Sequence, residues 1–219
     1  PENDKNFVND WEYIKTNAKY AMARVEYEFS PAFTAYANYG TSEGNEEYFY
    51  AGSQARKLIN SAGDFTAGAG GYRGSYEVET YELGLRGRFM LGDVTNNYAV
   101  SYSDFSRTAY GLTVNVSPAN GNIYNTPHIP RPTVNYGSLL QTADLQLSSV
   151  GLVNTFGFMD DKVLLTLGVR RQELFSGIFA SGVRKKEAYD ESKVTPAAAL
   201  LVNCLLYTSD AADEGLGVD

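Results

Sequence analysis

The sequence contains no run of about 18 apolar residues, and this absence excludes a transmembrane helix. Cysteine and histidine occur once each, as Cys204 and His128, so the residues offer no disulfide framework, Cys metal site or Ser/His/Asp catalytic set. The 18 Lys and Arg residues are outnumbered by 26 Asp and Glu residues and form no basic stripe, which disfavours nucleic-acid binding. The first residues, PENDKNFVNDW, lack the basic region and apolar core of a signal peptide, and we expect the natural chain to begin upstream.

Alternation with a period of two is the dominant pattern that the sequence does contain. In YAMARVEYEF, the odd-numbered residues from Ala21 to Phe29 are apolar or aromatic, while Arg24, Glu26 and Glu28 lie on the opposite face. ETYELGLRGRF repeats the pattern, with Leu83 and Leu85 on one face. The first of these runs also fits a helical stripe, whereas the later ones fit only a strand. Seven strands are predicted, over about 17–30, 33–42, 77–90, 95–105, 144–158, 163–176 and 191–203.

The connections between these strands alternate between short and long. Tight turns are predicted at Ser30–Ala32, Leu91–Val94 and Met159–Lys162, where Gly92-Asp93 and Asp160-Asp161 supply turn chemistry. Long Gly- and Asn-rich connections are predicted over about 41–78, 105–143 and 176–191. In an outer-membrane barrel, short turns face the periplasm and long loops face the exterior, so the alternation favours that architecture.

A soluble all-β domain is the competing interpretation of the same pattern. Several predicted strands exceed the ~9 to 11 residues that cross a bilayer at a tilt. Charged residues such as Arg86 and Arg88 share the face opposite to the apolar one. This segregation is expected in a membrane, because a charge at the lipid midplane costs roughly 2 to 4 kcal/mol. We therefore predict an all-β fold, an antiparallel transmembrane β-barrel segment that seven strands are too few to close.

Four stretches of the sequence resemble the TonB-dependent siderophore receptors of the ferrichrome-receptor type. They are QTADLQLSSVGLVNTFGFMDDKVLLTLGVRRQ (141–172), YDESKVTPAAALLV (189–202), GNIYNTPHIPRP (121–132) and YEFSPAFTAYANYG (27–40). The first resembles the paired mid-barrel strands of the family, and the last resembles a hairpin with a short periplasmic turn. The resemblance covers nearly all of residues 10–203 and implies a larger barrel of about 22 strands.

The resemblance implies import rather than catalysis, in the bacterial outer membrane. The implied partners are a ferric siderophore as transported ligand, the lipid bilayer and lipopolysaccharide, and the TonB–ExbB–ExbD complex. That complex would act through a plug domain that these residues do not contain, and no protein-bound cofactor is expected. Two alternatives stay open: a passive porin-like channel and a barrel-embedded enzyme.

Aromatic residues in the predicted loops are the candidate ligand-binding residues, since aromatic rings stack on a chelator. They are Tyr48, Tyr50, Tyr72, Tyr76, Tyr110, Tyr124 and Tyr136, with Phe49 beside them. Arg170-Arg171 and Arg184-Lys185-Lys186 are candidates for attracting an anionic chelate, although for the second group a solvated loop or a lipopolysaccharide contact is the favoured interpretation. His128 is interpreted as a loop residue rather than a metal ligand, because a siderophore already chelates its iron.

The last sixteen residues, CLLYTSDAADEGLGVD (204–219), resemble the translation of a sequencing-library transposase adapter. We expect this tail to be non-native, with a partial receptor barrel domain over 1–203. The tail carries four acidic and no basic side chains, so the formal net charge of −8 becomes −4 without it. It also carries Cys204, which leaves residues 1–203 free of cysteine.

Overall fold

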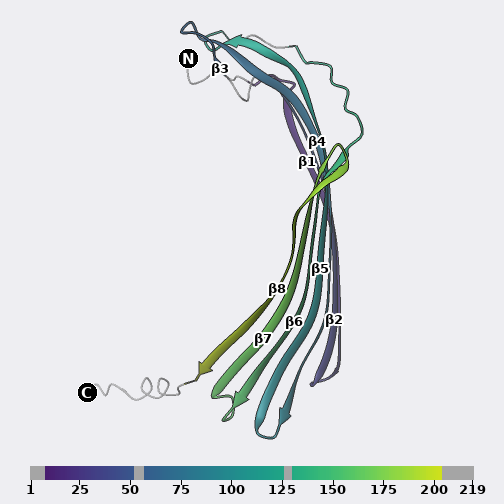
Figure 1. Ribbon diagram of the computed structural model, residues 1–219, viewed down its shortest axis with the longest axis vertical. Helices are drawn as coiled ribbons and strands as arrows, with labels where there is room; N and C mark the ends of the chain where they lie inside the picture. The colour runs from purple at the N-terminus through teal and green to yellow at the C-terminus, as the bar shows by residue number, and fades with distance from the viewer. Residues whose placement is uncertain (1–7, 52–56, 126–129, 204–219) are drawn as a thin grey trace, which may run out of the picture.

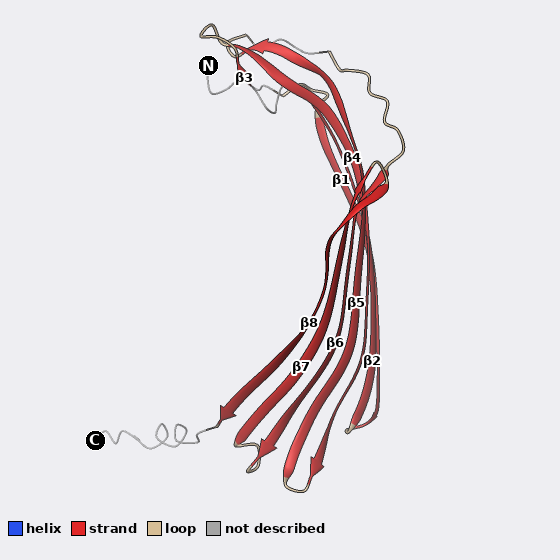
Figure 2. Cartoon of the chain, viewed as in Figure 1, coloured by secondary structure: helices blue, strands red, loops and turns tan. Residues whose placement is uncertain are grey.

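In a computed structural model of the protein, the structure describes residues 8–51, 57–125 and 130–203. Their secondary structure is a single antiparallel β-sheet (Figure 2). The strands are β1 (Tyr13–Ser30), β2 (Phe33–Ala51), β3 (Lys57–Leu58), β4 (Asp64–Leu91), β5 (Val94–Asn122), β6 (Leu140–Phe158), β7 (Val163–Ala180) and β8 (Val183–Val202). The prediction of an antiparallel all-β fold is confirmed, and the first segment, 13–30, is a strand throughout rather than a helix. No helix long and apolar enough to cross a membrane occurs among these residues.

The long strands follow one another in the sheet in the order of the chain. The order is β1-β2-β4-β5-β6-β7-β8, and the two-residue β3 pairs with the N-terminal end of β4. Figure 1 shows one curved layer in which each long strand lies beside the preceding one. Within the described part of the chain, β1 and β8 therefore pair along one side only.

The register gives the sheet one apolar and one polar face. Val25 lies opposite Ala37, Ala37 opposite Leu83, and Leu83 opposite Tyr102, so four neighbouring strands present these side chains on the same face. The residues one position along on each strand fall on the other face. The predicted alternation is thus realised across the sheet.

The described residues leave the apolar face almost uncovered. Val25 is 68% exposed and Leu83 is 54% exposed, whereas the described hydrophobic residues that are buried are Phe49, Phe65 and Ala69, all near the ends of β2 and β4 that lie away from the tight turns. A sheet that left such a surface in water would lose the main stabilisation of a fold. The arrangement fits a wall whose apolar face is covered by lipid.

The three predicted tight turns are confirmed at residues 31–32, 92–93 and 159–162. They are linked to one another across the edge of the sheet. The Arg88 amide donates to the Pro31 carbonyl (3.1 Å), the Tyr98 hydroxyl donates to the Ala32 carbonyl (2.9 Å), and the Arg88 guanidinium lies 2.9 Å from the Asp161 carboxylate. These contacts hold adjacent hairpins in register at the turn edge.

The long connections are much shorter than predicted, because the strands continue into them. β2 extends to Ala51 and β4 begins at Asp64, while β5 continues to Asn122, so much of 41–78 and 105–143 is strand. The prediction of a third long connection is wrong, because residues 176–191 form a β-hairpin whose turn is Ser181-Gly182. The physical reason is that the glycine and asparagine residues have a paired neighbouring strand that satisfies their backbone groups, which local composition does not reveal. At about 3.3 Å per residue, the 29 residues of β5 extend well beyond a bilayer core of ~30 Å.

Candidate functional site

The polar face carries a charged cluster in the half of the sheet nearer the tight turns. Arg24 and Arg86 both bind the Glu26 carboxylate, the former at 2.8 Å. Beside them, Glu82 accepts hydrogen bonds from Tyr36 (3.0 Å) and Asn38 (3.1 Å). Charges concentrated on this face identify it as the interior wall of a barrel, since the opposite face is apolar.

Four of the predicted tyrosines gather further along the same interior face. Tyr48 and Tyr50 on β2 lie an even number of residues from Asn38, and Tyr72 and Tyr76 on β4 lie an even number of residues from Glu82. No bulge intervenes, so all four side chains are on the interior face. Tyr48 and Tyr72 are register partners whose ring centroids lie 5.2 Å apart at an interplanar angle of 25°. Tyr48 also stacks on Tyr50, at 6.1 Å and 29°. We call Tyr48, Tyr50, Tyr72 and Tyr76 the tyrosine face.

Glycines lie beneath the rings of the tyrosine face. A Cβ atom added at Gly44 would overlap the ring of Tyr76, its register partner, and one added at Gly74 would overlap the ring of Tyr72. The rings therefore lie across the sheet, where the glycines leave room, instead of standing upright from it. Aromatic rings commonly cover glycines in neighbouring positions of a sheet in this way.

One basic residue that the sequence did not single out belongs to this face. The Arg107 guanidinium lies 5.5 Å from the centroid of the Tyr76 ring, within the range of a cation–π interaction. Arg107 is exposed and comes from β5, opposite Val78 of β4. The sequence could reveal its position only through the strand register, because 31 residues separate it from Tyr76.

The remaining predicted tyrosines lie elsewhere. Tyr110 lies on β5, an even number of residues from Tyr102, so its side chain is on the apolar side of the sheet. Tyr124 follows β5, is 55% exposed and packs against Gly63, whose φ of +88° no ordinary side chain favours. Tyr136 lies in the segment between β5 and β6, half-buried over Gly71 on the face opposite to the tyrosine face.

Tyr136 belongs to a separate polar network at this end of the sheet. The Arg73 guanidinium lies 5.2 Å from its ring centroid and 3.1 Å from the Glu47 carboxylate, which also accepts a hydrogen bond from Tyr13. Burial, reinforced by the charge of Glu47, holds the pKa of the Tyr136 phenol above its usual value. This network fastens the segment after β5 to β1, β2 and β4, away from the tyrosine face.

The predicted basic groups are engaged within the sheet. Arg170 donates to the Ser149 hydroxyl (2.9 Å) and Arg171 pairs with Glu173 (2.6 Å). The Arg184 guanidinium lies 2.8 Å from the Asp144 carboxylate. Lys185 is exposed. The Lys186 side chain, His128 and the predicted tail, 204–219, lie outside what the structure describes.

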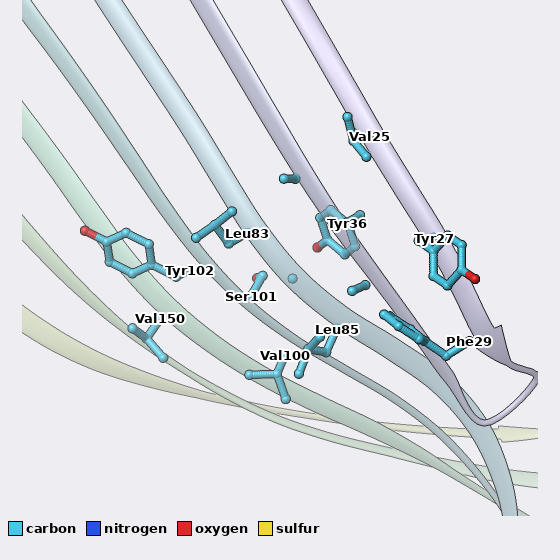
Figure 3. Close-up of a pocket in the computed structure, with 13 residues that line it drawn as sticks. Val25, Tyr27, Phe29, Tyr36, Leu83, Leu85, Val100, Ser101, Tyr102 and Val150 are labelled. Atoms are coloured by element: carbon cyan, nitrogen blue, oxygen red, sulfur yellow. The ribbon is translucent and has the colours of Figure 1, made fainter.

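The apolar face is hollowed in the half of the sheet nearer the tight turns, as the close-up in Figure 3 shows. The hollow has a volume of about 520 Å³, and Val25, Leu83, Leu85, Val100 and Val150 are among its lining residues. It holds no converging polar groups of the kind that orient a ligand. It is part of the surface that lipid chains cover.

No family model matches the chain. Over 209 residues, 92% of its length, the chain is 32% identical to the ferrichrome receptor FcuA of Yersinia enterocolitica. It is also similar to the structure of BauA, the ferric preacinetobactin receptor of Acinetobacter baumannii, with a TM-score of 0.71 and 28% identity over 96% of this chain. The chain spans 27% of the length of the first relative and 31% of the second.

More distant structures share the fold. The ferric citrate transporter FecA, in its unliganded form, matches 86% of this chain and 25% of its own, with a TM-score of 0.55 and 12% identity. The open form of the ferric-catecholate import receptor Fiu of E. coli K12 matches 90% of this chain and 34% of its own, with a TM-score of 0.54 and 16% identity.

The single sheet, its lipid-type apolar face and these likenesses define the class: the chain is a segment of the wall of an outer-membrane β-barrel. Within that class, it is similar over most of its length to TonB-dependent siderophore receptors, as the resemblance of the sequence implied. The relatives are receptors and transporters, not enzymes.

Proposed function

We propose that this chain forms part of the wall and the outer mouth of a receptor that imports a ferric siderophore by an energy-dependent route. The observation that carries the proposal is the tyrosine face, four rings that lie together on the interior face beyond the charged cluster. Aromatic rings supply a large contact area at little entropic cost, and their hydroxyl groups can bond to the polar rim of a chelate. Ferrichrome and ferric preacinetobactin, the ligands named for two relatives, are the first candidates to test.

Arg107 gives the tyrosine face a positive charge at its edge. A cation there favours a chelate that carries negative charge, and the exposed guanidinium can reorient towards it. Tyr110, Tyr124 and Tyr136 are kept as candidate ligand residues of the same receptor, although their positions place them outside the tyrosine face. No resident metal or other cofactor is proposed, because the iron arrives fully chelated.

Energy coupling would come from the TonB–ExbB–ExbD complex acting through a plug domain in another part of the receptor. The partners of the segment itself would be the bilayer and lipopolysaccharide around the apolar face. The charged cluster around Glu26 faces the interior, where such a domain would lie.

Uptake of radiolabelled iron by a strain lacking the full-length gene tests this function. The expected result under iron limitation is loss of uptake of one of the two named chelates, restored by the wild-type gene. Tyr48→Ala with Tyr72→Ala should restore it poorly, whereas Tyr36→Ala, on the same interior face but beside the charged cluster, should restore it. Unchanged uptake in the deletion strain, with every other receptor for that chelate also deleted, would reject the proposal.

A further inference from the structure

Each of two rings of the tyrosine face lies directly over a glycine. Gly44 and Tyr76 are cross-strand partners, and Gly74 precedes Tyr76 by two residues on the same face of β4, beneath Tyr72. Both glycines are buried beneath these rings, although the described residues form no second layer over the sheet. Gly111, on β5, extends this row of glycines, because a Cβ atom there would lie 3.0 Å from the Tyr72 hydroxyl oxygen.

We infer that Gly44 and Gly74 are positioning residues: they hold the rings of Tyr76 and Tyr72 flat so that the tyrosine face accepts a planar group of the ligand by stacking. The inference rests on the proposed function. A ring that lies across a glycine rests on the backbone there, because it occupies the space that a Cβ atom would fill. A methyl group at position 44 or 74 would occupy the place of the ring, so the ring would have to tilt out of the sheet.

The near-parallel alignment of the neighbouring rings supports this role. Tyr48 is inclined by only 25° to Tyr72 and by 29° to Tyr50, so the three rings form one near-parallel stack that a planar group can extend. Tilting Tyr72 would break the contact with Tyr48 as well. A stacked aromatic contact adds to the affinity, and the geometry of the ring decides whether a planar ligand obtains it.

The same arrangement occurs away from the tyrosine face and provides a matched control. A Cβ atom at Gly84 would overlap the ring of its register partner, Tyr36, beside the charged cluster. Gly84→Ala therefore introduces the same clash on the same interior face without touching the tyrosine face. Gly151→Ala is a second control, because its nearest neighbours would lie at ordinary contact distances of 3.8 and 4.0 Å.

A double-mutant cycle on the full-length receptor tests the inference. Binding of ferrichrome and of ferric preacinetobactin is measured with the wild type, Gly44→Ala, Tyr76→Ala and the double variant, each normalised to the amount of receptor in the outer membrane. Gly44→Ala should weaken binding by about three- to ten-fold, the size of one lost stacking contact, and should have no further effect once Tyr76 is alanine. Gly84→Ala and Gly151→Ala should bind as the wild type does.

An equal loss from Gly44→Ala with and without the Tyr76 ring, or no loss at all, would overturn the inference while leaving the proposed import function intact. If the wild type binds neither chelate, the proposed function fails instead. Fluorine NMR of fluorotyrosine at position 76 then still decides whether Gly44 positions the ring. The resonance should move in Gly44→Ala and stay in Gly151→Ala, and an unmoved resonance in Gly44→Ala rejects the positioning role.

Discussion

At the scale of single residues, the glycines of β2 and β4 depend on the tyrosines that cover them. Gly44 and Gly74 contribute to a Gly-rich stretch that is typical of irregular structure, yet both lie in strands because a tyrosine covers each of them. The tyrosines themselves carried a usable signal. Tyr48 and Tyr50 are two residues apart, and Tyr72 and Tyr76 are four apart, so each pair shares a face once strands are assumed. The stacking of Tyr48 on Tyr72 requires the register of two strands and could not be predicted from the sequence.

Arg184 is the second case in which surroundings decide the role of a residue. Its guanidinium lies 4.8 Å from the ring centroid of Phe175, 5.5 Å from that of Phe179 and 2.8 Å from the carboxylate of Asp144. The Asp144 side chain is only 12% exposed, so this pair is better shielded from water than the other ion pairs of the sheet. Arg184 therefore stabilises the β7–β8 hairpin, and its charge is not free to attract an anionic chelate.

Arg184→Lys should loosen this hairpin by about 1 kcal/mol, because an ammonium group keeps the charge but loses the planar stacking on both rings. The measurement is hydrogen exchange of the β7–β8 amides in the full receptor, where the affected amides should exchange about five-fold faster. Lys185→Met removes a charge from the exposed neighbouring side chain and should leave the exchange unchanged. Equal rates in Arg184→Lys and wild type would show that the stacking contributes nothing.

At the scale of elements, the hairpin turn at 181–182 was missed although its signal was present. Ser181 and Gly182 both have positive φ, +53° and +75°, which are the values of a two-residue type I′ turn. A Ser-Gly dipeptide between two β-forming runs is a turn signal, but the charged run Arg184-Lys185 after it favoured a loop. The strand alternation was predicted correctly for the segments near the tight turns, where the apolar face makes the period visible. Beyond that region both faces become polar, and the period gives no warning that the strands continue.

Ser181→Pro should fray the end of this hairpin, because proline fixes φ near −65° whereas the turn requires +53° at this position. Limited proteolysis of the receptor in detergent should then cut near residue 181 much faster than in the wild type. Ser181→Asn, which tolerates positive φ, is the matched control and should be cut no faster. Equal protection of all three proteins would mean that the turn has another conformation.

The assignment of the two faces predicts opposite outcomes for adjacent residues of β5. Val100 lines the apolar face and Ser101 points to the interior, where it lies near Gly151. Val100→Arg should destabilise the barrel by about 2 to 4 kcal/mol, since it places a charge in the lipid, whereas Ser101→Arg should cost under about 1 kcal/mol. Urea unfolding of the receptor in lipid vesicles measures the difference. Similar losses for both variants would contradict the assignment of the faces.

At the scale of the whole molecule, the sheet is a wall whose two outer strands still need neighbours. In the described residues β1 and β8, of 18 and 20 residues, pair along one side only, and Tyr20 on β1 and Leu200 on β8 are 84% and 67% exposed. In lipid, the unpaired amide and carbonyl groups of such an edge cannot be hydrated. The sequence predicts the same unpaired edges, because seven strands are too few for a closed barrel.

Residues 8–203 expressed alone should therefore fail to form a monomeric barrel. In detergent they should associate through the edges of β1 and β8, since strand pairing between copies satisfies the backbone groups that a single copy leaves open. Light scattering coupled to size-exclusion chromatography should show oligomers, and heating should not shift the gel mobility as it does for a closed barrel. The full-length receptor, purified in the same detergent, is the control and should be monomeric with a heat-dependent shift. A monomeric, heat-shifted fragment would show that β1 and β8 can pair with each other. The register of β1 with β2 would then have to accommodate a far tighter curvature than the sheet displays.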